Sequence, residues 1–180
     1  EIVHSKKLRK QKMINLWSAG CSRGEEPYSL AVMLLESLKG RNEFVPRVLA
    51  TDIDAQALEA AKEGVFKEDS LKNVPSFILR KYFTKAGFGR WAVNNSVKRI
   101  VLFKKHNLFD KPPFKYMDAV FCRNVRIYFD TMRAQQVLMY IHSSLRESGY
   151  LVLGRVETMP VSLKKHFVVV ESCYKIFQKK

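Results

Sequence analysis

The amino-acid sequence predicts an α/β domain in which helices cover both faces of a doubly wound, mostly parallel β-sheet. Short apolar segments typical of buried strands alternate with segments whose apolar residues recur every three or four positions, as on one face of a helix. Such alternation is typical of parallel sheets covered by helices. A length of 180 residues suits one domain with a substantial core, and no internal repeat divides the chain.

The first half of the chain is expected to form strand–helix units. The expected elements are a strand over residues 13–17, a helix over 25–39, a strand over 48–53, a helix over 55–63 and a short helix over 75–82. In the first helix Leu30, Leu34 and Leu38 recur every four residues. Asp54 is the expected N-cap of the second helix, and Gly64 follows its last residue.

The second half begins with an irregular stretch over residues 82–107. Gly87 and Gly89 supply turns there, and strands are expected over residues 91–93 and 97–103. The remaining expected elements are a strand over residues 117–122, a helix over 131–145, a strand over 150–153, and two strands over 167–170 and 174–177 that form a C-terminal hairpin.

Composition limits the class of protein. The chain is 47% hydrophobic and 27% charged, which is typical of a globular domain. It has no apolar run near the roughly 18 residues of a membrane helix and no visible signal peptide, so we expect a cytoplasmic protein without membrane insertion. Three widely spaced cysteines favour a reduced compartment, and no His/Cys spacing suggests a metal. Because the first residue is Glu1 and not Met, we expect a fragment or a processed chain.

The net charge of +15 is unevenly distributed. Five basic residues crowd the N-terminus: Lys6, Lys7, Arg9, Lys10 and Lys12. Residues 80–105 contain eight basic residues and no acidic one. Such a field attracts an anionic partner, whether nucleic acid, a membrane surface or an acidic protein. A solvated face that aids solubility is an equally good interpretation of the same charges.

The loop after the first strand is a candidate ligand site, because ligands of open α/β sheets bind beyond the carboxyl ends of the strands. Ala19 and Gly20 are small enough for a ligand to approach the backbone. The loop is neither a GxGxxG nor a Walker sequence, and Glu25 and Glu26 at the helix start disfavour phosphate. They suit a cationic ligand with ribose hydroxyls, such as S-adenosylmethionine (AdoMet). Alternatively, both acids only complement the helix dipole.

Two further strand ends carry polar residues. Asp52 ends the second strand, where an acid commonly accepts hydrogen bonds from a ribose diol. Arg123 and Asn124 follow the strand over residues 117–122, which places them at the same edge of the sheet. Asn124 could instead form only a turn, and Phe129 is expected to pack in the core.

Five sequence motifs together resemble the chemotaxis-receptor methyltransferase family, the CheR type. They are LWSAGCSRGEEPYS (residues 16–29), ATDID (50–54), HNL (106–108), FCRNV with IYFD (121–130), and GYLVLG with Glu157 (149–157). The motifs occur in the family's order and cover nearly the whole chain.

The resemblance implies a Rossmann-like, AdoMet-dependent methyltransferase domain over residues 1–180. It implies an inserted antiparallel β-subdomain at about residues 80–107, and it indicates that the family's N-terminal helical domain is absent. Matched to the family's motifs, the cofactor-binding residues are Glu26, less certainly Glu25, Asp52, Asn107, Leu108, Arg123 and Asn124. Tyr128 would be catalytic, close to the transferred methyl group. Arg23 stands where the family usually has a small hydroxyl residue, so an inward side chain would crowd the loop.

The function implied by the resemblance is AdoMet-dependent methylation of receptor glutamates, with S-adenosylhomocysteine as product, in chemotactic adaptation. The expected partners are acidic helical receptor segments that dock on the basic insert (residues 80–105), and the expected state is a monomer that does not bind nucleic acid. A non-catalytic AdoMet-binding scaffold is one alternative. A nucleic-acid methyltransferase is less favoured, because the DKPPF sequence (110–114) precedes the fourth strand, whereas the DPPY motif must follow it to hold a flipped base.

Overall fold

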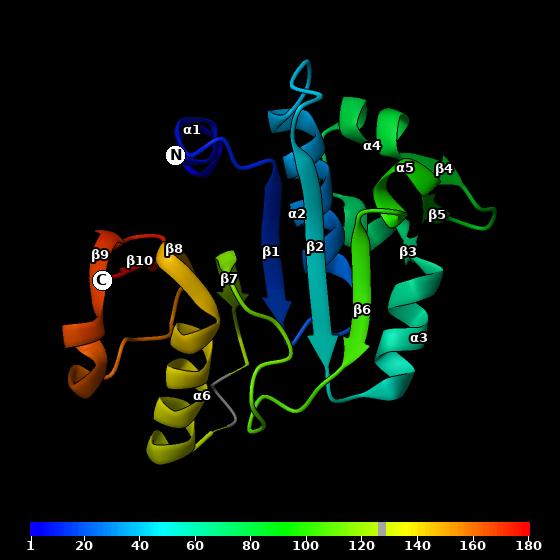
Figure 1. Cartoon of the computed structure of the whole chain (residues 1–180). Helices are drawn as coiled ribbons and strands as arrows, with labels where there is room; N and C mark the ends of the chain where they lie inside the picture. Colours follow the sequence, from blue (N-terminus) through cyan, green and yellow to red (C-terminus); the bar gives the residue numbers. More distant parts are fainter. Residues whose placement is uncertain (126–128) are drawn as a thin grey trace.

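The computed structural model describes residues 1–125 and 129–180 and contains a seven-stranded main sheet with the order β6-β2-β1-β7-β8-β10-β9 (Figure 1). Its strands are β1 (Met13–Ala19), β2 (Val45–Asp52), β6 (Val101–Lys105), β7 (Met117–Cys122), β8 (Leu145–Leu153), β9 (Phe167–Glu171) and β10 (Ile176–Lys179). The pairs β6–β2, β2–β1, β1–β7 and β7–β8 are parallel. The C-terminal hairpin β9–β10 joins antiparallel to β8. The predicted fold class is confirmed.

The register of the central strands places their carboxyl ends at one edge of the sheet. Ala19 of β1 lies opposite Thr51 of β2, and Ser18 lies opposite Phe121 of β7. The residues that follow β1, β2 and β7 therefore emerge side by side, at the lower edge in Figure 1.

The helices are α1 (Ile2–Leu8), α2 (Glu25–Ser37), α3 (Ala55–Glu63), α4 (Ser76–Tyr82), α5 (Asn95–Lys98) and α6 (Thr131–Ser144), with the 3-10 turns η1 (Glu68–Leu71) and η3 (Val161–His166). Four of the helices, α2, α3, α4 and α6, lie at the predicted positions, whereas α1 and α5 were not predicted. Asp54 caps α3 as predicted, because its side chain accepts hydrogen bonds from the backbone N–H groups of Gln56 and Ala57. Gly64 ends α3 with a φ of 60°. No helix among the described residues is long and apolar enough to cross a membrane.

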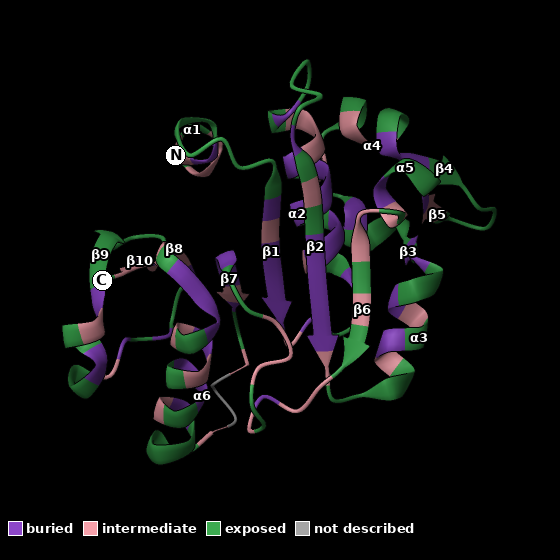
Figure 2. Ribbon diagram, viewed as in Figure 1, coloured by how far each residue is buried: buried purple, intermediate pink, exposed green. Residues whose placement is uncertain are grey.

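The central strands are buried along much of their length (Figure 2). Alternate residues of these strands enter two cores on opposite faces of the sheet. Ile14 and Leu16 of β1 pack in the core that includes the buried face of α2. Trp17 and Ala19 belong to the core that includes the buried face of α6. Apolar side chains on both faces explain why these strands are almost continuously hydrophobic.

The small antiparallel sheet has the order β3-β5-β4 and consists of β3 (Val65–Lys67), β4 (Phe83–Lys85) and β5 (Arg90–Val93). Two of its strands, β4 and β5, lie within residues 80–107, whereas β3 precedes that stretch. A three-residue strand such as β3 is too short to show an alternating pattern in the sequence.

The prediction of a strand over residues 97–103 is wrong for the first half of that range. Val97 lies in the one-turn helix α5 and is fully buried. The rest of the stretch is β6, which pairs with β2 in the main sheet, with Val101 opposite Val48. Periodicity indicates that a segment is extended, but not which sheet it joins.

A buried ion cluster attaches α1 to the sheet at the edge opposite the carboxyl ends. Asp118 of β7 is fully buried, and its carboxylate pairs with Lys6 Nζ of α1 at 2.9 Å and with Arg146 Nε of β8. The backbone N–H of Asn15 donates to the same carboxylate at 2.9 Å. The side chain of Lys6 is only 7% exposed, so this residue is not part of a solvated N-terminal face.

Candidate cofactor-binding site

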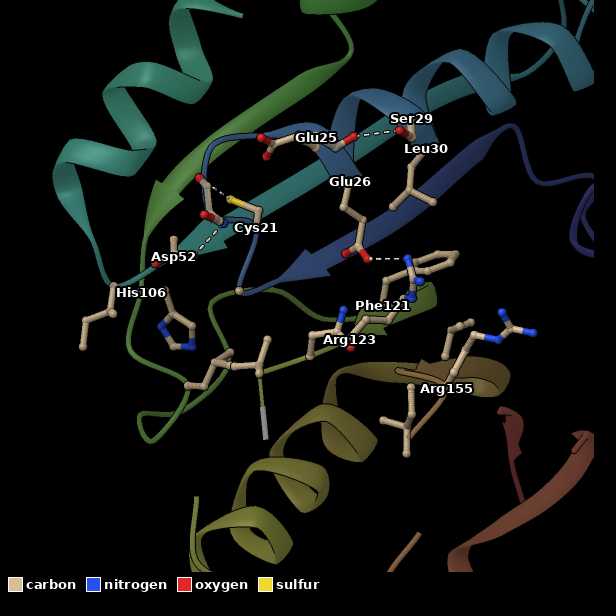
Figure 3. A pocket seen from close by; sticks show the side chains of 18 of the residues that line it. Cys21, Glu25, Glu26, Ser29, Leu30, Asp52, His106, Phe121, Arg123 and Arg155 are labelled. Carbon is tan, nitrogen blue, oxygen red and sulfur yellow. Dashed lines mark hydrogen bonds and ion pairs between the residues drawn. The ribbon is translucent and has the colours of Figure 1, made fainter. Parts of the chain in front are cut away.

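A cavity of about 1500 Å³ opens at the carboxyl ends of β1, β2, β7 and β8 (Figure 3). Its described walls include residues 20–22, 25, 26, 29, 30, 33, 52, 53, 106–109, 121, 123–125, 129, 152, 153, 155, 174 and 176. The three segments that the sequence singled out, after β1, at the end of β2 and after β7, thus meet at one site.

Glu26 forms an ion pair across the cavity wall with Arg123. Arg123 Nη1 lies 3.3 Å from Glu26 Oε2, and Ser18 Oγ donates to Glu26 Oε1 at 2.7 Å. Burial raises the pKa of Glu26 above its ordinary value, and the hydrogen bonds from Ser18 and Arg123 oppose that shift. A carboxylate and a guanidinium in contact are complementary to a zwitterionic amino-acid group, whose ammonium and carboxylate carry the opposite charges.

Asp52 ties the loop after β1 to the end of β2 and also lines the cavity. Its Oδ2 accepts a hydrogen bond from the backbone N–H of Ser22 at 2.7 Å, and its Oδ1 accepts one from Asp54 N–H at 3.0 Å. An ionised carboxylate has about four lone-pair sites, so acceptor capacity remains for a ligand hydroxyl. Asp52 therefore holds the loop after β1 in place and still has acceptor capacity for the hydroxyls of a ligand diol.

The two small residues of the loop have different roles. Gly20 lines the cavity with a φ of 82°, and a Cβ atom there would lie 2.4 Å from Val125 Cγ2. Ala19 is 1% exposed and packs in the core beneath the site, so its side chain is not among the described lining groups. The reason is the strand's alternation, which places Ala19 on the same face as Trp17.

The segment after β6 brings His106, Asn107 and Leu108 to the cavity. Asn107 Oδ1 accepts a hydrogen bond from the backbone N–H of Phe109 at 3.1 Å, which fixes the turn. The backbone N–H of His106 donates to the carbonyl of Asp52 at 2.9 Å. Burial lowers the pKa of the His106 imidazole. An aromatic ring, an amide and an apolar side chain form a wall suited to a planar heterocycle.

Asn124 both lines the cavity and forms a turn, with a φ of 58°. Its backbone N–H and that of Gly154 donate to one carboxylate oxygen of Glu157, at 3.1 and 2.7 Å. Glu157 is 5% exposed and so joins the ends of β7 and β8 from inside the protein.

Phe129 packs against Phe109, with ring centroids 4.7 Å apart, and both rings pack against the core that includes α6.

Two further residues, Tyr128 and Arg23, were singled out from the sequence, and two others that line the cavity were missed. Tyr128 lies outside the described residues. Arg23 is exposed and is absent from the described cavity wall, so it does not crowd the loop. Sequence reasoning missed Arg155, which lines the cavity beyond the end of β8. It also missed Cys21, whose thiol pKa is raised to about 12 by burial and by Asp52, so the thiol stays protonated at neutral pH.

Known proteins match this chain over most of its length. The family model of the CheR methyltransferase SAM (AdoMet) binding domain matches residues 1–176. A chemotaxis protein methyltransferase of Borreliella burgdorferi is 40% identical over 166 residues, covering 85% of this chain and 59% of that protein. Chemotaxis protein methyltransferase 1 of Pseudomonas aeruginosa is 36% identical over 163 residues, covering 88% and 59%. The chain thus spans 59% of the length of these relatives.

A solved structure from Nostoc punctiforme, named only provisionally as an O-methyltransferase, superposes on the chain with a TM-score of 0.50. The alignment covers 78% of this chain and 32% of that one. At 16% sequence identity the likeness supports the fold alone.

Proposed function

Because the chain belongs to the CheR methyltransferase family and spans its SAM-binding domain, we propose that it transfers methyl groups from AdoMet to glutamate carboxylates of chemotaxis receptors. The single observation that supports this proposal best is the ion pair between Glu26 and Arg123 on the cavity wall. Asp52, at the end of the neighbouring strand β2, lines the same cavity.

The described residues fit the cofactor. Glu26 would hold the ammonium group of the methionine end, and Arg123, next to Asn124, would hold its carboxylate. Asp52 would accept hydrogen bonds from the ribose diol. The His106–Leu108 wall would lie beside the adenine, and Glu25 at the rim adds negative charge for a cationic ligand.

The chain's contribution to the reaction would be positioning and shielding. Bound AdoMet supplies an electrophilic methyl group on a sulfonium sulfur. A glutamate side chain is already ionised at pH 7, so no residue of the chain has to remove a proton from it. Holding the reacting groups in line can lower a barrier by about 7–11 kcal/mol. The Tyr128 hydroxyl is proposed to orient the acceptor carboxylate, and this role rests on the sequence resemblance.

Replacing Asp52 with alanine is expected to weaken AdoMet binding by about 1.5–3 kcal/mol, the range for hydrogen bonds to a charged group. Asp52→Asn should lose less, because it keeps an acceptor oxygen for the Ser22 N–H. Titration calorimetry measures both affinities, with Asp54→Asn as the matched control, since that side chain caps α3. Unchanged affinity in Asp52→Ala would contradict the ribose role.

Methyl transfer itself is tested by incubating the 180-residue chain and labelled AdoMet with an acidic receptor fragment, duplex DNA or RNA. The expected product is an alkali-labile methyl ester on receptor glutamates only. Methylation of DNA or RNA instead would contradict the proposal. Tight AdoMet binding without transfer to any of the three would favour a non-catalytic AdoMet-binding module.

The basic insert (residues 80–105) is proposed to dock the acidic receptor segment. None of its residues, all of which the structure describes, lines the cavity. Figure 1 shows β4 and β5 near the opposite end of β1 and β2 from the carboxyl edge. A segment docked on β4 and β5 would have to extend along the protein to reach the site, whereas Lys104 and Lys105 at the end of β6 lie opposite Thr51 and Asp52.

Reversing Arg80, Arg90 and Arg99 to glutamate should raise the Michaelis constant for the receptor fragment and leave AdoMet affinity unchanged. All three side chains are exposed, whereas Lys98 Nζ donates to the Glu63 carbonyl and is unsuitable. The effect should shrink at high salt, because exposed charges are screened over about 8 Å at physiological ionic strength. Steady-state kinetics at two salt concentrations provide the measurement, and an unchanged Michaelis constant at low salt would refute docking on this surface.

A further inference from the structure

The cavity has one acidic half and one basic end. Glu25, Glu26 and Asp52 all come from the start of α2 and the end of β2. Two arginines line the cavity among the described residues, Arg123 and Arg155. In Figure 3, Arg155 lies at the opposite end of the site from Asp52 and His106. The charge therefore changes sign along the cavity.

The two arginines differ in what they contact. Arg123 is paired with Glu26, so its charge is already balanced within the site. The guanidinium of Arg155 has no hydrogen bond or ion pair to any described residue, and its side chain is exposed to the cavity. Among the described lining residues, Arg155 is thus the arginine that remains available to an anionic group.

The backbone that carries Arg155 is held in place. Gly154 N–H donates to Glu157 Oε2 at 2.7 Å, and Glu157 N–H donates to the Gly154 carbonyl at 3.0 Å, which closes a turn around Arg155. The same carboxylate oxygen accepts the N–H of Asn124 at 3.1 Å. The position of Arg155 is thereby fixed relative to the loop after β7, although its side chain is free.

A methyl-accepting glutamate meets this charge distribution as an anion. The acidic half of the cavity is complementary to a cationic cofactor and repels a second carboxylate. The end that carries Arg155 attracts one, and a guanidinium can bind a carboxylate through two parallel hydrogen bonds. Resting on the function proposed above, we propose that Arg155 binds the carboxylate of the incoming glutamate and so selects an ionised acidic side chain as the methyl acceptor.

The test compares Arg155→Gln and Arg155→Lys with the unchanged chain in methylation of an acidic receptor fragment. Arg155→Gln should raise the Michaelis constant for the fragment about tenfold, as expected for the loss of a partly exposed ion pair between a guanidinium and a carboxylate. Arg155→Lys keeps the charge and should recover part of the loss. AdoMet affinity, measured by calorimetry, should stay within error in both, because Arg155 lies away from the acidic half.

Arg41→Gln is the matched control, because it removes an equal charge from the exposed turn between α2 and β2. Binding of the fragment to the chain loaded with S-adenosylhomocysteine, followed by fluorescence anisotropy, should change by the same factor as the Michaelis constant.

Each outcome decides the question. Equal Michaelis constants for Arg155→Gln and the unchanged chain overturn the role of Arg155 and leave the proposed function standing. A parallel loss of AdoMet affinity assigns Arg155 to the cofactor instead and also overturns it. If the unchanged chain neither binds nor methylates the fragment, the proposed function fails, and this inference fails with it.

Discussion

Replacing Asp118 with asparagine should lower the free energy of unfolding by about 3–5 kcal/mol, the usual cost of leaving a buried charge without its partner. Asp118 is fully buried and pairs with both Lys6 and Arg146, whose side chains are 7% and 10% exposed. Asparagine keeps the size of the side chain and removes the negative charge. Two cations would then remain in the interior with no carboxylate between them.

Urea denaturation measures this loss, and Asp130→Asn is the control. Asp130 is an exposed N-cap of α6 and forms a surface ion pair with Arg133. Because asparagine is an equally good N-cap, and because exposed pairs contribute only about 0–1 kcal/mol, that variant should be nearly neutral.

A second substitution separates the buried charge from other effects of Asp118→Asn. Adding Lys6→Met to Asp118→Asn should recover part of the stability, because one unpaired cation is then gone. A loss below about 1 kcal/mol for Asp118→Asn alone, the size of an exposed pair, would show that the cluster contributes no more than surface charges.

Replacing Gly20 with alanine should destabilise the protein by about 2–5 kcal/mol and weaken AdoMet binding. The left-handed conformation at a φ of 82° costs a non-glycine residue about 1–2 kcal/mol. The new methyl group would also lie 2.4 Å from Val125 Cγ2, and overpacking of this kind costs about 1–3 kcal/mol. Relief of the overlap would move the loop after β7, which carries Arg123 and Asn124.

The double variant Gly20→Ala with Val125→Ala divides the two causes. Removing the Val125 methyl groups relieves the overlap but leaves the backbone strain, so part of the lost stability and most of the lost affinity should return. Thermal unfolding and calorimetry on the two single variants and the double variant complete the cycle. If the double variant is no better than Gly20→Ala, backbone strain alone accounts for the loss.

Local patterns in the sequence were enough to predict the fold class and the main parts of the candidate site. The alternation of strand and helix segments predicted the parallel sheet, and the α3 helix was predicted with its bounds and its Asp54 cap. Glu26, Asp52 and Asn124 were predicted to share one edge, because residues that follow parallel strands emerge at the same edge of a sheet. These predictions depend only on short-range spacing and on a general rule of the fold.

The tertiary structure alone decided the contacts between distant segments. Lys6 belongs to a run of N-terminal cations, yet it is buried against Asp118, 112 positions further along the chain. Ala19 is small enough to let a ligand approach the backbone, but the alternation of side chains along β1 directs its side chain into the core. Arg155 reaches the cavity because β8 pairs with β7 and Glu157 joins the ends of the two strands. Spacing along the sequence determines which residues share a strand or a helix face, whereas strand order and register determine which of those faces meet.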